Sequence, residues 1–206
     1  MNWQKKIKRV FFDIWSVESN KRIIKDVLLF FVATVAFHFI YWNTNMDSWM
    51  FGPFNKPLYD FFRNLAFHCA KPFCFWFIDK PTEIVDTTFY FYHIGNLGQK
   101  IYDLTMEINV DCSGVKQLLQ FLLIMLLCRG LWYKRLLYFL GGSLVILFFN
   151  VVRIVFLTVL FVYQTYKFQN VHDWVARPAM YVIIFGLWYI WVSCPKLSGK
   201  VKTNKT

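Results

Sequence analysis

The longest apolar run of this chain, Leu136–Tyr163, contains a single charged residue, Arg153. Lipid offers no hydrogen bonds to the backbone, so a run of this kind must form an α-helix. About 20 apolar residues cross a bilayer, and a longer run must tilt, break or project. Three other apolar runs accompany it, and we predict membrane spans at residues 23–42, 115–131, 136–155 and 179–192.

The composition indicates the same class. Of the 206 residues, 57% are hydrophobic, and the chain carries 24 Phe, 11 Tyr and 9 Trp. A water-soluble domain is less apolar and richer in charge. The sequence has no internal repeats. We therefore predict an all-α multi-span membrane protein, a helical bundle in which residues 1–206 form a single integral membrane domain.

Basic residues are unevenly distributed in this chain of formal net charge +11. Residues 1–26 carry seven basic and three acidic groups, and the tail 196–206 carries four lysines and no acid. The turn at residues 128–135 is also basic, whereas residues 43–111 carry eight acidic and five basic groups. Because basic segments stay inside, we predict that both termini are cytoplasmic and that the acidic segment is extracytoplasmic. This pattern argues against a nucleic-acid partner.

Two segments are predicted to lie along the membrane surface. Residues 1–22 combine aromatic anchors with basic groups, as an interfacial amphipathic helix does. Residues 57–78 are aromatic but also charged, and Pro72 is expected to break a helix there. A full crossing by residues 57–78 would place the acidic stretch on the wrong side of the membrane. We therefore expect an outer-face or re-entrant helix, with two half-crossings as the alternative.

Residues 82–110 differ in character from the rest of the chain. Thr87–Ile94 is rich in β-formers, Gly95–Gly98 has the composition of a turn, and the apolar residues that follow partly alternate with polar ones. The pattern predicts a small extracytoplasmic β-hairpin. This hairpin leads directly to Cys112, at the start of the second predicted span.

Cys112 lies in an Asp-Cys-Ser-Gly sequence before a predicted helix. The free N–H groups and the positive dipole end of that helix favour a thiolate. Lys116 adds positive charge on the same helix face, whereas Asp111 opposes it. Gly114 allows a substrate backbone to approach closely. We interpret Cys112 as a nucleophile, with a buried structural thiol as the alternative.

Arg153 is costly within an apolar helix unless it faces a polar cavity or a partner. Asn150 lies three residues earlier on the same helical face and can bind the guanidinium. Arg153 is suited to stabilising a thiolate or an oxyanion. The alternatives are a snorkelling arginine and a structural tie to an outer acid such as Asp111.

His172 precedes the last span and can exchange protons near neutral pH. Its neighbour Asp173 would point elsewhere on a regular helix and is a weak candidate for an orienting partner. At about 1.5 Å per residue from Arg135, Arg153 lies about 27 Å along its helix, near the outer interface. The charge topology therefore predicts that Cys112, Arg153 and His172 meet at one membrane face. No metal site is predicted from the remaining cysteines and histidines.

Three motifs together resemble the exosortase/archaeosortase family. They are Cys-Ser-Gly at residues 112–114, Asn-x-x-Arg at residues 150–153, and His172 before the last span. The resemblance covers about residues 57–194, and the chain looks like a short form with only the catalytic core. Archaeosortases tend to have arginine where His172 stands, so the resemblance favours the bacterial branch.

The resemblance implies a membrane-embedded cysteine protease/transpeptidase of the bacterial cytoplasmic (inner) membrane, with its active site on the extracytoplasmic face. The implied substrate is an exported protein with a C-terminal motif, a membrane helix and a basic tail. Cys112 would form a thioester, Arg153 would stabilise the oxyanion or thiolate, and His172 would act as acid and base. A glycan or lipid amine would accept the product, and no cofactor is implied. The supporting residues would be Asn150, Ser113, Gly114 and Lys116.

Three rival functions stay open at this point. A non-enzymatic membrane assembly subunit would pair Arg153 with an acid of a partner helix and would tolerate loss of the thiol. A small transporter would use Arg153 as an anion site, but the chain lacks the broken-helix repeats of transporters. Another kind of cysteine acyltransferase is the third, because a thiol does not name its acyl donor.

Overall fold

The computed structural model describes residues 18–44, 49 and 51–194. Contacts divide the chain into two units, residues 1–46 and 47–206. In the first unit, helix α2 (Glu18–Thr44) contains an apolar window, Ile24–Tyr41, that is long enough to cross a membrane. Residues 1–17 of the predicted interfacial helix and the predicted basic tail 196–206 lie outside the described residues.

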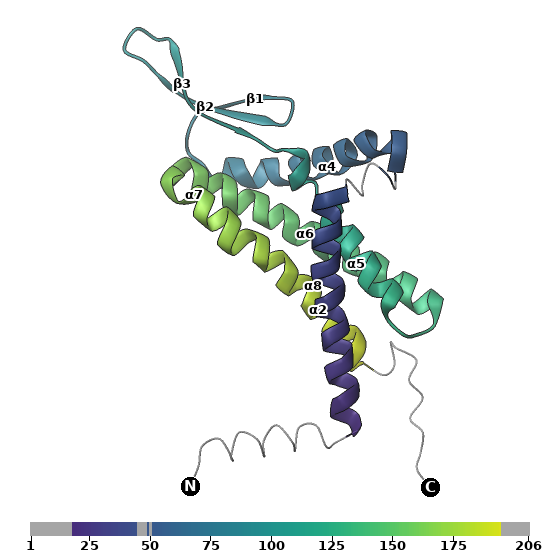
Figure 1. Cartoon of the computed structure of the whole chain (residues 1–206). Helices are drawn as coiled ribbons and strands as arrows, with labels where there is room; N and C mark the ends of the chain where they lie inside the picture. The colour runs from purple at the N-terminus through teal and green to yellow at the C-terminus, as the bar shows by residue number, and fades with distance from the viewer. Residues whose placement is uncertain (1–17, 45–48, 50, 195–206) are drawn as a thin grey trace, which may run out of the picture. The chain divides into compact units, whose positions relative to one another are not determined.

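The second unit combines a small sheet with a set of helices (Figure 1). Two of its helical segments, α6 and the stretch Thr165–Ser193, are long and apolar enough to cross a membrane, whereas the apolar α5 is shorter. The helical elements, in chain order, are η1 (Gly52–Phe54), α4 (Asn55–Phe77), η2 (Val110–Cys112), α5 (Val115–Leu127), α6 (Trp132–Tyr163), α7 (Thr165–Val171), the π-helical turn η3 (His172–Ala176) and α8 (Arg177–Ser193).

Helix α4 continues through Pro72 without interruption, so the predicted break at that residue is wrong. Proline removes one backbone donor from a helix interior, a cost that packing can offset. Phe67, Ala70 and Cys74 are buried on both sides of Pro72 and hold the helix in place. A continuous helix also removes the basis for two separate half-crossings.

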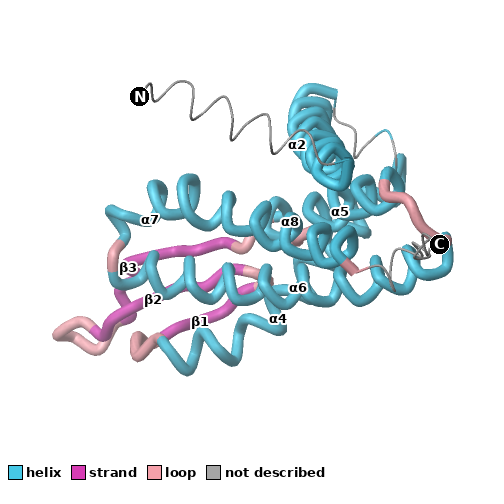
Figure 2. Tube along the Cα trace, turned by 90° about the horizontal axis from the view of Figure 1, so that it is seen from below, coloured by secondary structure: helices cyan, strands magenta, loops and turns pink. Residues whose placement is uncertain are grey.

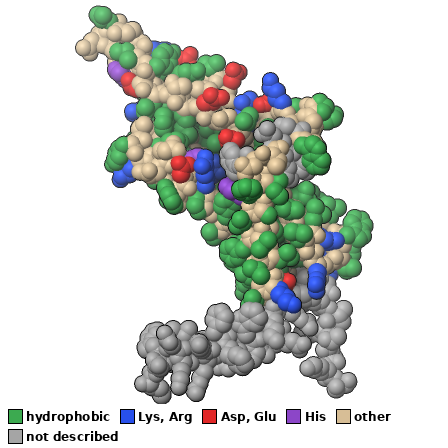
Figure 3. Space-filling view, viewed as in Figure 1, with side chains coloured by type: hydrophobic (Ala, Val, Ile, Leu, Met, Phe, Trp, Pro, Cys, Tyr) green, Lys and Arg blue, Asp and Glu red, His purple; other side chains and the backbone are tan. Residues whose placement is uncertain are grey.

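The sheet consists of β1 (Thr82–Val85), β2 (Thr88–Ile94) and β3 (Lys100–Glu107), antiparallel and in that order. Strands β2 and β3 form the predicted hairpin before Cys112. Strand β1 is an addition that sequence reasoning missed, because four residues carry little periodic signal. Charged side chains gather over this part of the molecule in Figure 3, whereas hydrophobic ones predominate along the helices.

One face of the sheet packs on α4 and α6, as Figure 2 shows from below. The rings of Phe89 in β2 and Phe67 in α4 lie 5.1 Å apart. Ile154 of α6 joins the same buried cluster, and Cys112 packs against it. The core beneath the sheet therefore fixes the position of the segment that carries the thiol.

Helix α6 is one unbroken helix of 32 residues, about 48 Å long at 1.5 Å per residue. Helix α5 packs closely on it at Gly142, where a Cβ atom would lie 2.5 Å from Cε1 of Phe121. Helix α8 contacts both, and the hydroxyl of Tyr138 in α6 donates a 2.7 Å hydrogen bond to the carbonyl of Leu187. These contacts make α6 the central support of the unit.

Candidate active site

A tight turn connects the sheet to α5 and presents Cys112. The side chain of Asn109 accepts a hydrogen bond from the backbone N–H of Val110. The N–H of Cys112 then donates to the carbonyl of Asn109 at 2.9 Å. Gly114 follows with φ of 84°, a conformation that favours glycine. Asn109 and Gly114 thus shape the turn, and α5 begins directly after it.

Arg153 and Cys112, 41 residues apart in sequence, contact each other through their side chains. Nη2 of Arg153 donates to Sγ of Cys112 at 3.9 Å. Arg153 is only 8% exposed, and its Nε is buried without a hydrogen-bond partner among the described residues. The guanidinium is therefore buried beside the thiol, and part of its hydrogen-bonding capacity is unused among the described residues.

Asn150 holds the backbone of the same cysteine. Its Nδ2 donates a 2.7 Å hydrogen bond to the carbonyl of Cys112, and the side chain is fully buried. A Cβ at Gly114 would lie 3.1 Å from Nδ2 of Asn150. Since Asn150 and Arg153 are one turn apart on α6, one stretch of helix positions both the backbone and the sulfur of Cys112.

Ser113 and Lys116, two of the predicted supporting residues, have different surroundings. Ser113 is buried, and its hydroxyl accepts a 3.3 Å hydrogen bond from the N–H of Val115 at the start of α5. Lys116 interacts electrostatically with Arg177 and Asp111. Ser113 therefore supports the turn itself, whereas Lys116 belongs to a group of charges beside it.

Burial raises the pKa of the Cys112 thiol, and the Asp111 carboxylate raises it further, while the Arg153 guanidinium acts in the opposite direction. Burial thus opposes the thiolate that the sequence analysis expected the helix start and Lys116 to favour. Cys112 packs against the buried cluster beneath the sheet, and removing water from a thiol disfavours its charged form. Burial therefore favours the neutral thiol, and a base that takes its proton would assist its reaction.

His172 opens the π-helical turn η3, and Asp173 is its partner. Nδ1 of His172 lies 3.0 Å from Oδ1 of Asp173. The expectation that Asp173 would point away assumed a regular helix, whereas the chain here forms a π-turn. Asp173 also accepts a hydrogen bond from Nε2 of Gln169 at 2.6 Å. It forms an ion pair with Arg177, whose Nη1 lies 3.1 Å from Oδ1 of Asp173. Single π-turns are frequent at functional sites.

Aromatic contacts link His172 to α6. The ring of His172 stacks on Phe168 at 5.7 Å, and Phe168 meets Phe161 of α6 at 5.2 Å. Both α7 and η3 also contact α6. Among the described residues, no hydrogen bond joins His172 to Cys112 directly.

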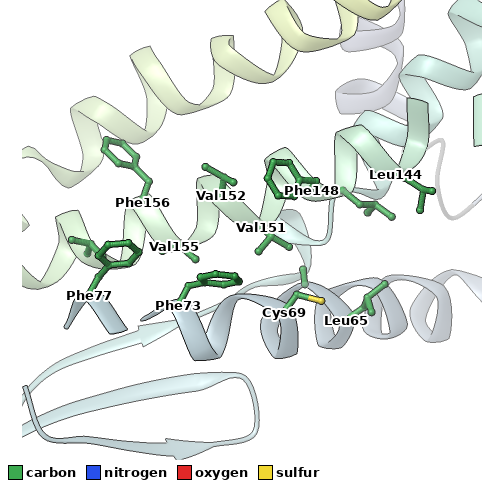
Figure 4. A pocket seen from close by; sticks show the side chains of 13 residues that line it. Leu65, Cys69, Phe73, Phe77, Leu144, Phe148, Val151, Val152, Val155 and Phe156 are labelled. Atoms are coloured by element: carbon green, nitrogen blue, oxygen red, sulfur yellow. The ribbon is translucent and has the colours of Figure 1, made fainter. Parts of the chain in front are cut away.

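An apolar groove of about 740 Å³ lies between α4 and α6 (Figure 4). Its walls include Ala66 of α4 and Val151 of α6, which belong to or pack against the same cluster as Cys112. Cys69 also lines the groove. The groove and the thiol thus share one set of supporting residues.

Comparison with family models gives a match to the transmembrane exosortase model (Exosortase_EpsH) over residues 87–190, half of the chain. The matched range contains Cys112, Asn150, Arg153 and His172. Comparison with curated proteins and with solved structures gives no match.

Proposed function

This chain belongs to the transmembrane exosortase family, and we propose that it is a cysteine transpeptidase that cleaves the C-terminal sorting signal of exported proteins. Family membership supports a membrane protein with a transpeptidase-type role in general. The observation that carries the specific proposal is the 3.9 Å contact between Nη2 of Arg153 and Sγ of Cys112. A buried guanidinium directed at a thiol stabilises the negative charge that forms when the thiol reacts.

The first half of the reaction forms a thioester. Sγ of Cys112 attacks the scissile carbonyl carbon while His172 takes the thiol proton, directly or through a water molecule. The guanidinium of Arg153 stabilises the resulting oxyanion. The carbon–nitrogen bond then breaks, and His172 returns the proton to the leaving amine. Because burial raises the pKa of Cys112, proton removal accompanies the attack.

The second half transfers the acyl group. The amine of an acceptor on a surface glycan or lipid attacks the thioester carbon, and His172 takes a proton from that amine. The carbon–sulfur bond breaks, and the sulfur of Cys112 recovers a proton from His172. Asp173, 3.0 Å from Nδ1 of His172, fixes the orientation of the imidazole through both halves. Water in place of the amine would give hydrolysis.

The site faces the extracytoplasmic side in this proposal. The distribution of basic residues supports cytoplasmic termini and an exported sheet. The protein would then act on exported polypeptides at the outer surface of a bacterial cytoplasmic membrane, consistent with a substrate whose basic tail stays inside.

The membrane helix of the substrate is proposed to lie in the α4–α6 groove. The groove is lined by apolar side chains and adjoins the cluster that supports Cys112. Cys69 offers a test, because a cysteine placed in the substrate helix would form a disulfide with Cys69 under mild oxidation. A Cys69→Ala variant must lose this product. Occupation by lipid alone would leave Cys69 unlinked in the presence of substrate.

The experiment for the whole proposal uses a candidate exported protein with a C-terminal apolar helix and a basic tail. The candidate is co-expressed with the wild type or with Cys112→Ala, Arg153→Ala or His172→Ala, and its size is measured. We expect each variant to abolish processing while the enzyme remains in the membrane. Cys194→Ala is the matched control, a half-buried cysteine at the end of α8, and it should process normally.

The same variants separate the rival functions. A membrane assembly subunit would tolerate Cys112→Ala and lose its complex with Arg153→Ala. Normal processing by Cys112→Ala would rule out the cysteine mechanism.

A further inference from the structure

Strand β3 forms one edge of the sheet and leads into the catalytic turn. Its last residue, Glu107, precedes Cys112 by five residues. One side of β3 pairs with β2. Among the described residues, no strand pairs with its other side, the outer edge of the sheet. An edge of this kind presents unpaired backbone donors and acceptors.

The register identifies which backbone groups face outward. The N–H of Ile108 donates to the carbonyl of Thr87, and hydrogen-bonded pairs alternate along an antiparallel ladder. Met106 and Leu104, opposite Phe89 and Phe91, therefore bond to β2. It follows that Thr105 and Glu107 direct their N–H and C=O groups away from it.

The two edges of the sheet differ in a way that favours β3 for pairing. Strand β1 has four residues and follows Pro81, features that blunt an edge. Strand β3 has eight residues and no proline, and both Thr105 and Glu107 are exposed.

We propose that the outer edge of β3 receives an extended segment of the polypeptide substrate as an additional strand, bonded to the backbone of Thr105 and Glu107. The proposal rests on the peptide-cleaving function above. Five residues reach at most about 17 Å, so a strand at Glu107 would deliver the residues next to its scissile bond to Cys112. Backbone pairing would give affinity that depends little on sequence.

The experiment uses the full chain and measures alkylation of Cys112. The probes are mixed-sequence pentapeptides with a chloromethyl ketone at the C-terminus, whose chloride the sulfur of Cys112 displaces. A second library carries N-methylated backbone amides, which cannot donate hydrogen bonds. Peptide mapping separates Cys112 from Cys69. We expect the unmethylated library to react about tenfold faster, the gain from roughly two net hydrogen bonds.

Proline variants test the edge itself. Thr105→Pro and Glu107→Pro each remove an outward N–H and no hydrogen bond of the ladder, so both should erase the tenfold preference. Thr105→Val and Glu107→Gln keep the N–H and should preserve it. Thr82→Pro removes an outward N–H from β1, on the other edge, and should also preserve it. An unchanged rate with iodoacetamide shows that Cys112 and its surroundings remain folded in each variant.

Equal rates for the two libraries, or an unchanged preference in both proline variants, would overturn the docking proposal. Conversion of a dimer to a monomer by Thr105→Pro, with the library preference unchanged, would assign the edge to a second copy instead. These results leave the proposed function intact when Cys112→Ala still abolishes processing. Processing by Cys112→Ala, in contrast, rejects the proposed function itself.

Discussion

The side-chain amide of Asn150 donates a 2.7 Å hydrogen bond to the backbone carbonyl of Cys112, one helical turn from the guanidinium that contacts the sulfur. This hydrogen bond reaches the backbone of Cys112 and not its sulfur. Asn150 is a positioning residue, because it fixes the turn that presents the thiol to Arg153.

Replacing Asn150 with aspartate should slow the reaction of Cys112. Asn150→Asp keeps the side-chain shape but substitutes an acceptor that repels the Cys112 carbonyl and attracts Arg153. One unit of upward shift in the thiol pKa corresponds to about a tenfold slower reaction at neutral pH. Iodoacetamide alkylation of Cys112 measures the rate and its pH profile. Thr158→Val is the control, a buried hydroxyl on α6 that bonds its own helix. Wild-type rate and pH profile in Asn150→Asp would contradict this role.

The pH midpoint of Cys112 alkylation should shift in opposite directions when its two charged neighbours are replaced. Arg153 lowers the pKa of the thiol and Asp111 raises it. Arg153→Met should therefore move the midpoint of alkylation to higher pH and slow the reaction at neutral pH. Asp111→Asn should move it to lower pH and accelerate the reaction. Burial raises the pKa of Cys74 to about 11, so Cys74 should stay unmodified at neutral pH as an internal control. Shifts of the same sign in both variants would contradict the electrostatic account.

Gly114 should be required both for its backbone conformation and for the close approach of Asn150. Gly114→Ala places a Cβ 3.1 Å from Asn150 and strains a residue with φ of 84°, at about 1–2 kcal/mol for the backbone alone. Gly98→Ala is matched to it, with φ of 76° and open space around the added Cβ. Both variants should lower thermal stability, and only Gly114→Ala should abolish processing. Full processing by Gly114→Ala would show that the contact with Asn150 is dispensable.

Two adjacent glycines of α6 should respond oppositely to alanine. A Cβ at Gly142 would lie 2.5 Å from Phe121, whereas a Cβ at Gly141 meets nothing within 4 Å. Gly142→Ala should destabilise the protein by about 1–3 kcal/mol through overpacking of α5 on α6. Gly141→Ala should stabilise it by about 0.5–1 kcal/mol, the usual gain in a helix interior. Thermal unfolding in one detergent checks both signs, and equal effects would mean that α5 does not pack against Gly142.

The contact between Cys112 and Arg153 could be predicted because the sequence offered few other solutions. An arginine inside an apolar helix must find a polar partner, and the charge topology put Cys112 at the same membrane face. Asn150 was singled out by its spacing of three residues from Arg153, but its predicted partner was wrong. Asn150 donates to the carbonyl of Cys112, and Oδ1 of Asn150 and Nε of Arg153 have no hydrogen-bond partner among the described residues. The meeting of His172 with these two residues remains a prediction.

Other features depend on contacts between segments that are distant in sequence, so the local sequence could not predict them. The pKa of Cys112 rises because α4 and the sheet bury it, and no local motif encodes that burial. Helix α4 passes Pro72 because residues on both sides are packed. The pairing of His172 with Asp173 occurs within a π-turn, and a 3.6-residue period does not anticipate such a turn.

Helix α6 is about 48 Å long, whereas the hydrocarbon layer of a bilayer is about 30 Å thick. An unbroken helix of this length must tilt or project beyond the hydrocarbon layer, and its tilt depends on the lipid around it. Because Asn150 and Arg153 of α6 both contact Cys112, a change of tilt would carry the thiol with the helix and change its height relative to the membrane surface. Turnover in vesicles should therefore vary with acyl-chain length, which makes the surrounding lipid a determinant of catalytic rate.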